Sequence, residues 1–170
     1  MRRLIILRVV VLLVACVPSA ASFAQQTEVA FGGLKHDSSQ QIEITSDSLS
    51  VDQGKATAEF KGTVLAGQGT LRINADQLLV EYKTDGKTTT GEIYRMSASG
   101  NVTLTNGAEA AEAEEAVYVV ADGKIRMAGD VLLTQGLNAI SGSVLNIDLN
   151  SGNAVFEGRV RTILQPQDNK

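Results

Sequence analysis

Residues 59–82, EFKGTVLAGQGTLRINADQLLVEY, contain the pattern that the rest of the chain repeats. The pattern starts with a glycine two residues before a valine, Gly62 and Val64, and closes with a small residue before an acid, Ala75 and Asp76. Equivalent glycines follow at Gly100, Gly129 and Gly158, which are 29 residues apart. The step from Gly62 to Gly100 is longer by nine residues, and the extra residues fall in the hydrophilic run 83–92. A fixed period of this length indicates a stacked repeat architecture rather than one packed globule.

Apolar and polar residues alternate within each repeat, as in strands with one buried face. Phe60 and Val64 share one parity, and the polar Lys61 lies between them. The next strand changes parity between Ala75 and Leu78. A spacing of three keeps apolar groups on one side only if the strand bulges or turns there. The sequence therefore predicts a corner at each acidic position.

The whole pattern predicts an all-β fold, an elongated sheet of stacked antiparallel strands. No segment keeps a helical face, and residues 108–116, although rich in Ala and Glu, are expected to form a strand because of their place in the repeat. The expected strands are 41–45, 48–52, 56–66, 69–75, 78–83, 92–105, 110–113, 116–121, 124–134, 138–141, 144–149 and 153–164.

The N-terminal segment resembles a secretory signal peptide. Arg2 and Arg3 precede the apolar run 4–17, and small residues before position 25 predict cleavage between Ala24 and Gln25. An alternative is a bacterial lipobox at 13–16, in which Cys16 would be lipidated. The predicted organisation is a signal peptide at 1–24, a flexible lead-in at 25–40, a β-domain at 41–164 and a polar tail at 165–170.

Composition and charge argue against several classes of function. The net charge is −4, and loss of the three arginines in residues 1–24 takes it to −7, which argues against nucleic acid as a partner. The single histidine, His36, lies in the lead-in without a metal-ligating neighbour, and we interpret it as solvated. The acids at the corners are expected to accept backbone N–H bonds rather than to hold calcium. We expect no catalytic residues, metal or cofactor.

The interior is predicted to be poorly filled, because inward positions are so often Ala, Gly or Val and the chain has no tryptophan. The four repeated glycines share the inward parity, and we interpret them as leaving a cavity shaped for acyl chains. The alternative is that they only let two sheet faces approach. Tyr82 and Tyr118 are expected at the mouth of this trough, since each has an apolar body and a polar tip.

Several motifs together resemble the LptA/OstA family of periplasmic lipopolysaccharide transport proteins over about 41–163. They are I-x-I-x-S-D-x-L at 42–49, F-x-G-x-V at 60–64, Q-G-T-L-x-I-x-A-D at 68–76 and G-D-V at 129–131. The resemblance implies a β-jellyroll, open at both ends, whose apolar interior carries lipid A acyl chains. It also implies head-to-tail self-association between an LptC-like inner-membrane protein and the N-terminal domain of an LptD-like outer-membrane protein.

Site residues follow from the inward parity and from the resemblance together. The resemblance places Ile42 and Ile44 at the N-terminal mouth and Leu104, Tyr118 and Val120 in the interior. Lys83, Lys87 and Arg95 follow no fixed family motif, so the resemblance implies no phosphate-contacting role for them. The residues expected to contact lipid acyl chains are Ile42, Ile44, Leu49, Phe60, Val64, Ile73, Leu78, Val80, Met96, Val102, Leu104, Tyr118, Val120, Met127 and Val131.

Unpaired edge strands at 41–45 and 153–164 would allow one chain to continue the sheet of the next, because heterologous edge pairing forms filaments. Three other functions stay open at this point. They are a soluble shuttle for phospholipid or lipoprotein acyl chains, a membrane-tethered LptC-like member of the same fold, and a purely structural β-solenoid scaffold.

Overall fold

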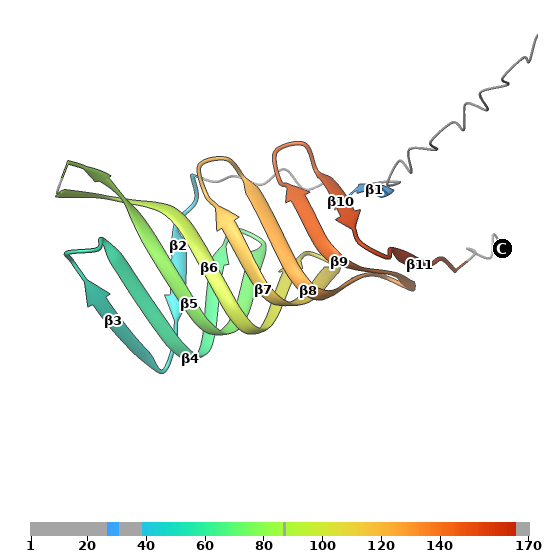
Figure 1. Cartoon of the computed structure of the whole chain (residues 1–170), viewed down its shortest axis with the longest axis horizontal. Helices are drawn as coiled ribbons and strands as arrows, with labels where there is room; N and C mark the ends of the chain where they lie inside the picture. The colour runs from blue at the N-terminus through green and yellow to red at the C-terminus, as the bar shows by residue number, and fades with distance from the viewer. Residues whose placement is uncertain (1–26, 31–38, 87, 166–170) are drawn as a thin grey trace, which may run out of the picture.

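The structure is a computed structural model that describes residues 27–30, 39–86 and 88–165 (Figure 1). This part of the chain forms an 11-stranded antiparallel sheet in the order β1-β10-β9-β8-β7-β6-β5-β4-β2, with β3 also beside β4 and β11 also beside β9. The strands are β1 (Thr27–Ala30), β2 (Ile42–Thr45), β3 (Ser48–Asp52), β4 (Thr57–Gln68), β5 (Leu71–Asp85), β6 (Thr88–Asn106), β7 (Glu109–Val119), β8 (Lys124–Gln135), β9 (Asn138–Asp148), β10 (Asn153–Glu157) and β11 (Arg161–Ile163).

The sheet folds over on itself along a line that crosses every long strand, and Figure 1 shows these ribbons turning and rising again. The pairing register shifts at this line, for example between Asn74 and Gln77 of β5 and between Glu112 and Glu115 of β7. The predicted corners at the acidic positions are therefore confirmed. We call the line the bend.

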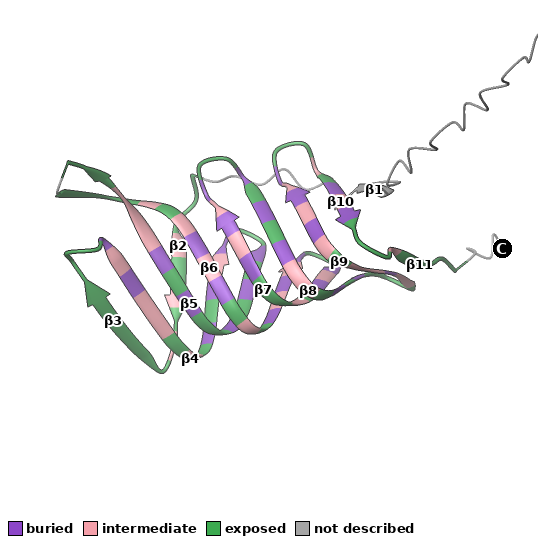
Figure 2. Ribbon diagram, in the orientation of Figure 1, coloured by how far each residue is buried: buried purple, intermediate pink, exposed green. Residues whose placement is uncertain are grey.

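Two walls meet at the bend. The first wall consists of β2, residues 64–68, 71–75, 102–106, 109–113, 131–135 and 138–142, and β11. The second wall consists of β3, residues 57–61, 77–81, 95–99, 115–119, 124–128 and 144–148, then β10 and β1. The apolar core lies between the two walls, and buried residues alternate with exposed ones along the long strands (Figure 2).

The repeated glycines build the bend. Gly100 has φ +76° and Asn101 has φ +48°, so two consecutive residues adopt the left-handed conformation, which favours glycine. A Cβ added at Gly100 would lie 2.5 Å from the Asp76 carboxylate of the neighbouring strand. The other three glycines face the equivalent side chains in the same way, in the pairs Gly62–Asp47, Gly129–Glu114 and Gly158–Ser143.

The strand boundaries differ from the sequence-based ones in several respects. The second strands of the repeats run through their corners without a break, because a bulge shifts the register and leaves the ladder in place. The expected strand 153–164 is divided at Gly158 into β10 and β11. Residues 27–30, expected as part of a flexible lead-in, form β1, which pairs with β10. Residues 108–116 lie largely in β7, so a strand was the correct prediction.

Candidate functional site

Almost all of the expected acyl-contacting residues lie in the core between the walls. Ile42, Ile44 and Phe60 are partly buried and pack against it. The buried members of the predicted set are Val64, Ile73, Leu78, Val80, Met96, Val102, Leu104, Tyr118, Val120, Met127 and Val131.

Leu49 is the exception, since it is 56% exposed on β3. It pairs directly with Phe60, and opposed residues of an antiparallel pair share a face, so Leu49 belongs to the inner face. Val51, 61% exposed and paired with Ala58, lies on the same face. No described strand continues the second wall beyond β3. We call this exposed apolar end, formed by Ile42, Ile44, Leu49 and Val51, the N-terminal mouth.

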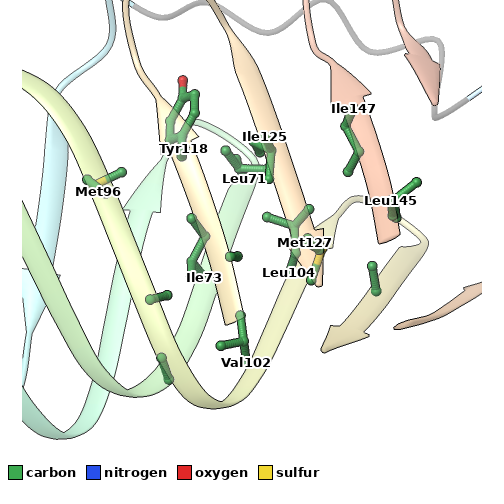
Figure 3. Close-up of a cluster of buried hydrophobic side chains, with 14 of the residues drawn as sticks. Leu71, Ile73, Met96, Val102, Leu104, Tyr118, Ile125, Met127, Leu145 and Ile147 are labelled. Carbon is green, nitrogen blue, oxygen red and sulfur yellow. The ribbon is translucent and has the colours of Figure 1, made fainter. Parts of the chain in front are cut away.

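Further inward residues complete the core but were absent from the predicted site, although their parity in the repeat could have identified them. They are Leu71, Ile125, Leu133, Ile140, Leu145, Ile147, Leu149 and Phe156. Figure 3 shows Leu71, Ile125, Leu145 and Ile147 among the buried side chains. Val51 was missed in the same way.

The expectation of a poorly filled interior is wrong for this structure. Side chains from both walls pack together, and the cavity next to Ile42, Met96 and Tyr118 has a volume of only about 10 Å³. Such a volume is at the lower limit for a single water molecule. Small inward residues such as Ala66 and Ala98 let the walls come close enough to fill the space, while the repeated glycines serve the bend.

Tyr118 is buried, 1% exposed, so it lies in the interior, as the resemblance implied, and not at the mouth, where its amphipathic side chain had suggested. Its hydroxyl donates a hydrogen bond of 3.0 Å to Gln68 Oε1, and Figure 3 shows the oxygen pointing away from the apolar cluster. Burial raises the pKa of Tyr118 to about 12, so the hydroxyl keeps its proton at neutral pH. Tyr82, the other tyrosine expected at the mouth, is partly buried against the core.

Polar side chains line the rim of the first wall, at the ends of its strands. Gln68, Asn106 and Glu109 are all buried. Thr70 donates a 2.8 Å hydrogen bond to Asn106 Oδ1, and Gln135 donates a 2.6 Å hydrogen bond to Glu109 Oε1. Buried polar groups are stable when they are hydrogen-bonded. These contacts therefore allow the strand ends of the first wall to be buried away from water. We call it the polar rim.

Two basic residues of the hairpin formed by β5 and β6, Lys83 and Arg95, form ion pairs within that hairpin. Arg95 Nη2 lies 2.9 Å from Glu81 Oε1, and this hydrogen-bonded pairing raises the arginine pKa. Lys83 Nζ lies 2.9 Å from Glu92 Oε2, and the contact lowers the pKa of that carboxyl. The arrangement adds no support for a phosphate-binding role, and Lys87 lies outside the described residues.

Several expectations concern residues that the structure does not describe, namely the signal peptide, Cys16, the Ala24–Gln25 cleavage site and His36. Within the described ranges, no group of three or more His, Cys, Asp or Glu side chains is placed to hold a metal ion. Those ranges also hold no helix with the length and apolarity needed to span a membrane.

Comparisons with known proteins agree on one family. A family model described as "LptA/(LptD N-terminal domain) LPS transport protein" matches residues 43–161. An uncharacterized protein of Rhizobium meliloti is 33% identical over 159 residues, which is 89% of this chain and 86% of that protein. The lipopolysaccharide export system protein LptA of Haemophilus influenzae is 28% identical over 140 residues, 78% of this chain and 81% of LptA.

The structural comparison supports the same fold. The crystal structure of LptH from Pseudomonas aeruginosa, described as the LptA-homologous periplasmic component of the lipopolysaccharide transport device, matches with a TM-score of 0.67. The match covers 77% of this chain and 99% of LptH at 15% sequence identity. The described residues therefore have the LptA-like β-jellyroll fold, as the resemblance implied.

Proposed function

The chain belongs to the family of lipopolysaccharide transport proteins that includes LptA and the N-terminal domain of LptD, and from this premise we propose a specific role for it. It is a non-catalytic periplasmic protein that binds lipopolysaccharide by the lipid A acyl chains between its two walls. It passes the lipid along a bridge from an LptC-like inner-membrane protein to the N-terminal domain of an LptD-like outer-membrane protein.

The observation that carries this proposal is a pair of apolar rows on the inner face. In the second wall, directly opposed residues run from the exposed mouth to the far end of the sheet as Leu49, Phe60, Leu78, Ala98, Ala116, Met127, Leu145 and Phe156. In the first wall a facing row runs as Ile44, Ala66, Ile73, Leu104, Ala111, Leu133 and Ile140. An acyl chain needs such an uninterrupted apolar surface.

Because the interior is filled, binding requires the walls to separate. Each methylene transferred from water to an apolar surface contributes about 0.8 kcal/mol of favourable free energy. This gain offsets the free energy lost when wall-to-wall contacts are broken. The large inward side chains stay in an apolar environment throughout. The exchange of wall contacts for lipid contacts makes binding possible without a preformed lumen.

Photo-crosslinking tests the binding site with adjacent residues as matched controls. Leu104 is fully buried on the inner face, and Thr103 lies on the opposite face of the same strand. A crosslinker at Leu104 or Val131 should capture lipopolysaccharide in a Gram-negative host, and one at Thr103 or Asp130 should not. Equal capture at both faces would contradict the proposal. Mass spectrometry of the captured lipid separates this carrier from a phospholipid shuttle.

The bridge is proposed to form by joining sheet edges head to tail. Free edges lie at β2 and β3 at one end of the described sheet and at β11 and β1 at the other. The expected edge at 153–157 is covered, because β1 pairs with β10. Deleting residues 159–170 removes β11 and should leave the monomer folded but shorten the oligomers measured by light scattering. Oligomers of unchanged size would contradict edge pairing through β11.

A further inference from the structure

The two walls meet again at a second edge, opposite the bend. Gln68 lies at the end of its strand in the first wall, six residues beyond Gly62. Tyr118 lies near the end of its strand in the second wall, four residues beyond Glu114. The strands β5 and β6 separate β4 from β7 in the sheet, yet the Tyr118 hydroxyl and Gln68 Oε1 are 3.0 Å apart. We call the line along which these wall ends meet the seam.

The hydrogen bond across the seam is oriented by its surroundings. Gln68 Nε2 donates a 3.0 Å hydrogen bond to the carbonyl oxygen of Gln40, just before β2. This contact turns Oε1 of the same amide toward Tyr118. The tyrosine is protonated at neutral pH and donates to this oxygen, and burial raises its pKa further, to about 12.

The small cavity lies directly beneath this hydrogen bond. Both Tyr118 and Gln68 line it, and Ile42 connects it to the N-terminal mouth. Leu71 and Ile73 of the first wall and Met96 of the second wall also line it, so this is a place where apolar side chains of both walls are not in full contact. Separation of the walls at this point would enlarge an existing gap.

We propose that the Tyr118–Gln68 hydrogen bond is a clasp that keeps the seam closed in the empty protein, and that an acyl chain enters sideways through the seam when the clasp opens. This inference rests on the proposed function. Once the clasp is open, the phenol and the amide can hydrogen-bond to the ester and hydroxyl groups at the base of an acyl chain. The polar rim supplies further groups of the same kind, while the aliphatic chain occupies the apolar interior.

Thiol accessibility tests the clasp without any lipid. The reporter is Ile73→Cys in a Cys16→Ser background, and the variant is Tyr118→Phe, which keeps the ring and removes the hydroxyl. Loss of one buried hydrogen bond should raise the maleimide labelling rate of the reporter about five-fold. Tyr94→Phe, at an exposed tyrosine, is the matched control and should leave the rate unchanged.

A second reporter separates seam opening from general destabilisation. Leu145→Cys lies in the interior of β9, away from the seam hydrogen bond, and its labelling should be the same with and without Tyr118→Phe. An equal rise at both reporters, or no rise at Ile73→Cys, would overturn the clasp.

Lipid entry is measured with a fatty acid that carries an anthroyl fluorophore. Its association rate should rise about five-fold in Tyr118→Phe and stay unchanged in Tyr94→Phe. An unchanged rate in Tyr118→Phe would overturn sideways entry. If the unsubstituted protein bound neither this probe nor lipopolysaccharide, the proposed function would fail. The thiol measurement would still decide whether the Tyr118–Gln68 hydrogen bond keeps the seam closed.

Discussion

The bend and the seam are the two long edges of the same interior, and different forces close them. At the bend the main chain passes from one wall to the other, and backbone hydrogen bonds continue there, from Asp47 N to Gly62 O at 3.0 Å and from Ser143 N to Gly158 O at 3.1 Å. At the seam, side chains join the wall ends, as in the Tyr118–Gln68 contact.

This difference indicates which edge can move. Opening the bend would break main-chain hydrogen bonds between neighbouring strands, whereas opening the seam at the clasp loses a net hydrogen-bond contribution of about 1 kcal/mol and apolar contact between the walls. The bend therefore acts as the hinge and the seam as the opening edge.

The largest expected effect is at the bend. Gly100→Ala places a Cβ against Asp76 at a φ of +76°, and we expect it to lower the free energy of unfolding by about 3 kcal/mol. Gly91→Ala is the matched control, because Gly91 has φ +80° but nothing within 4 Å of an added Cβ. It should cost only about 1 kcal/mol, from backbone strain alone. If urea unfolding gave the same loss of unfolding free energy for both variants, the contact with Asp76 would not be what shapes the bend.

An intermediate effect is expected at the seam at alkaline pH. The pKa of Tyr118 rises from about 10 in an unfolded chain to about 12 in the folded protein, so its stabilising contribution is complete below pH 10 and is lost as the pH rises through about 12. Unfolding free energy should therefore fall more steeply above pH 10 in the unsubstituted protein than in Tyr118→Phe, by about 1 kcal/mol near pH 11. Parallel pH profiles would argue against a buried, protonated phenol.

The smallest effect concerns the second residue of the bend. Asn101 has φ +48°, and its side-chain amide donates a 2.8 Å hydrogen bond to Asp76 Oδ2 at the surface. Asn101→Gly loses this bond but relieves the backbone, so the change in unfolding free energy should be within about 0.5 kcal/mol of zero. Asn101→Ala loses the bond and keeps the strain, and it should cost about 1 kcal/mol more. Reversal of this order in thermal unfolding would contradict the account of the bend.

The repeated glycines illustrate how far the sequence could be interpreted. The repeat of these glycines, with 29 residues between each of the last three, and the change of parity at Asp76 and Glu114 predicted where the corners lie. Their inward parity suggested that they leave room for a ligand, and this interpretation was wrong. Strict alternation of inward and outward side chains holds only in a regular extended strand. At Gly100 the positive φ turns the chain and brings the glycine against Asp76.

The amino-acid sequence by itself determined the strands, the corners and the apolar inner face, because period-2 alternation and the repeat are local properties of the chain. Only the tertiary structure decided that the interior is filled, that Leu49 and Val51 remain exposed and that β1 covers β10. It also brought Tyr118 to Gln68, which lies 50 residues earlier in the chain. These features depend on how closely two walls approach across the bend, and that distance results from the summed packing of many side chains rather than from any one segment.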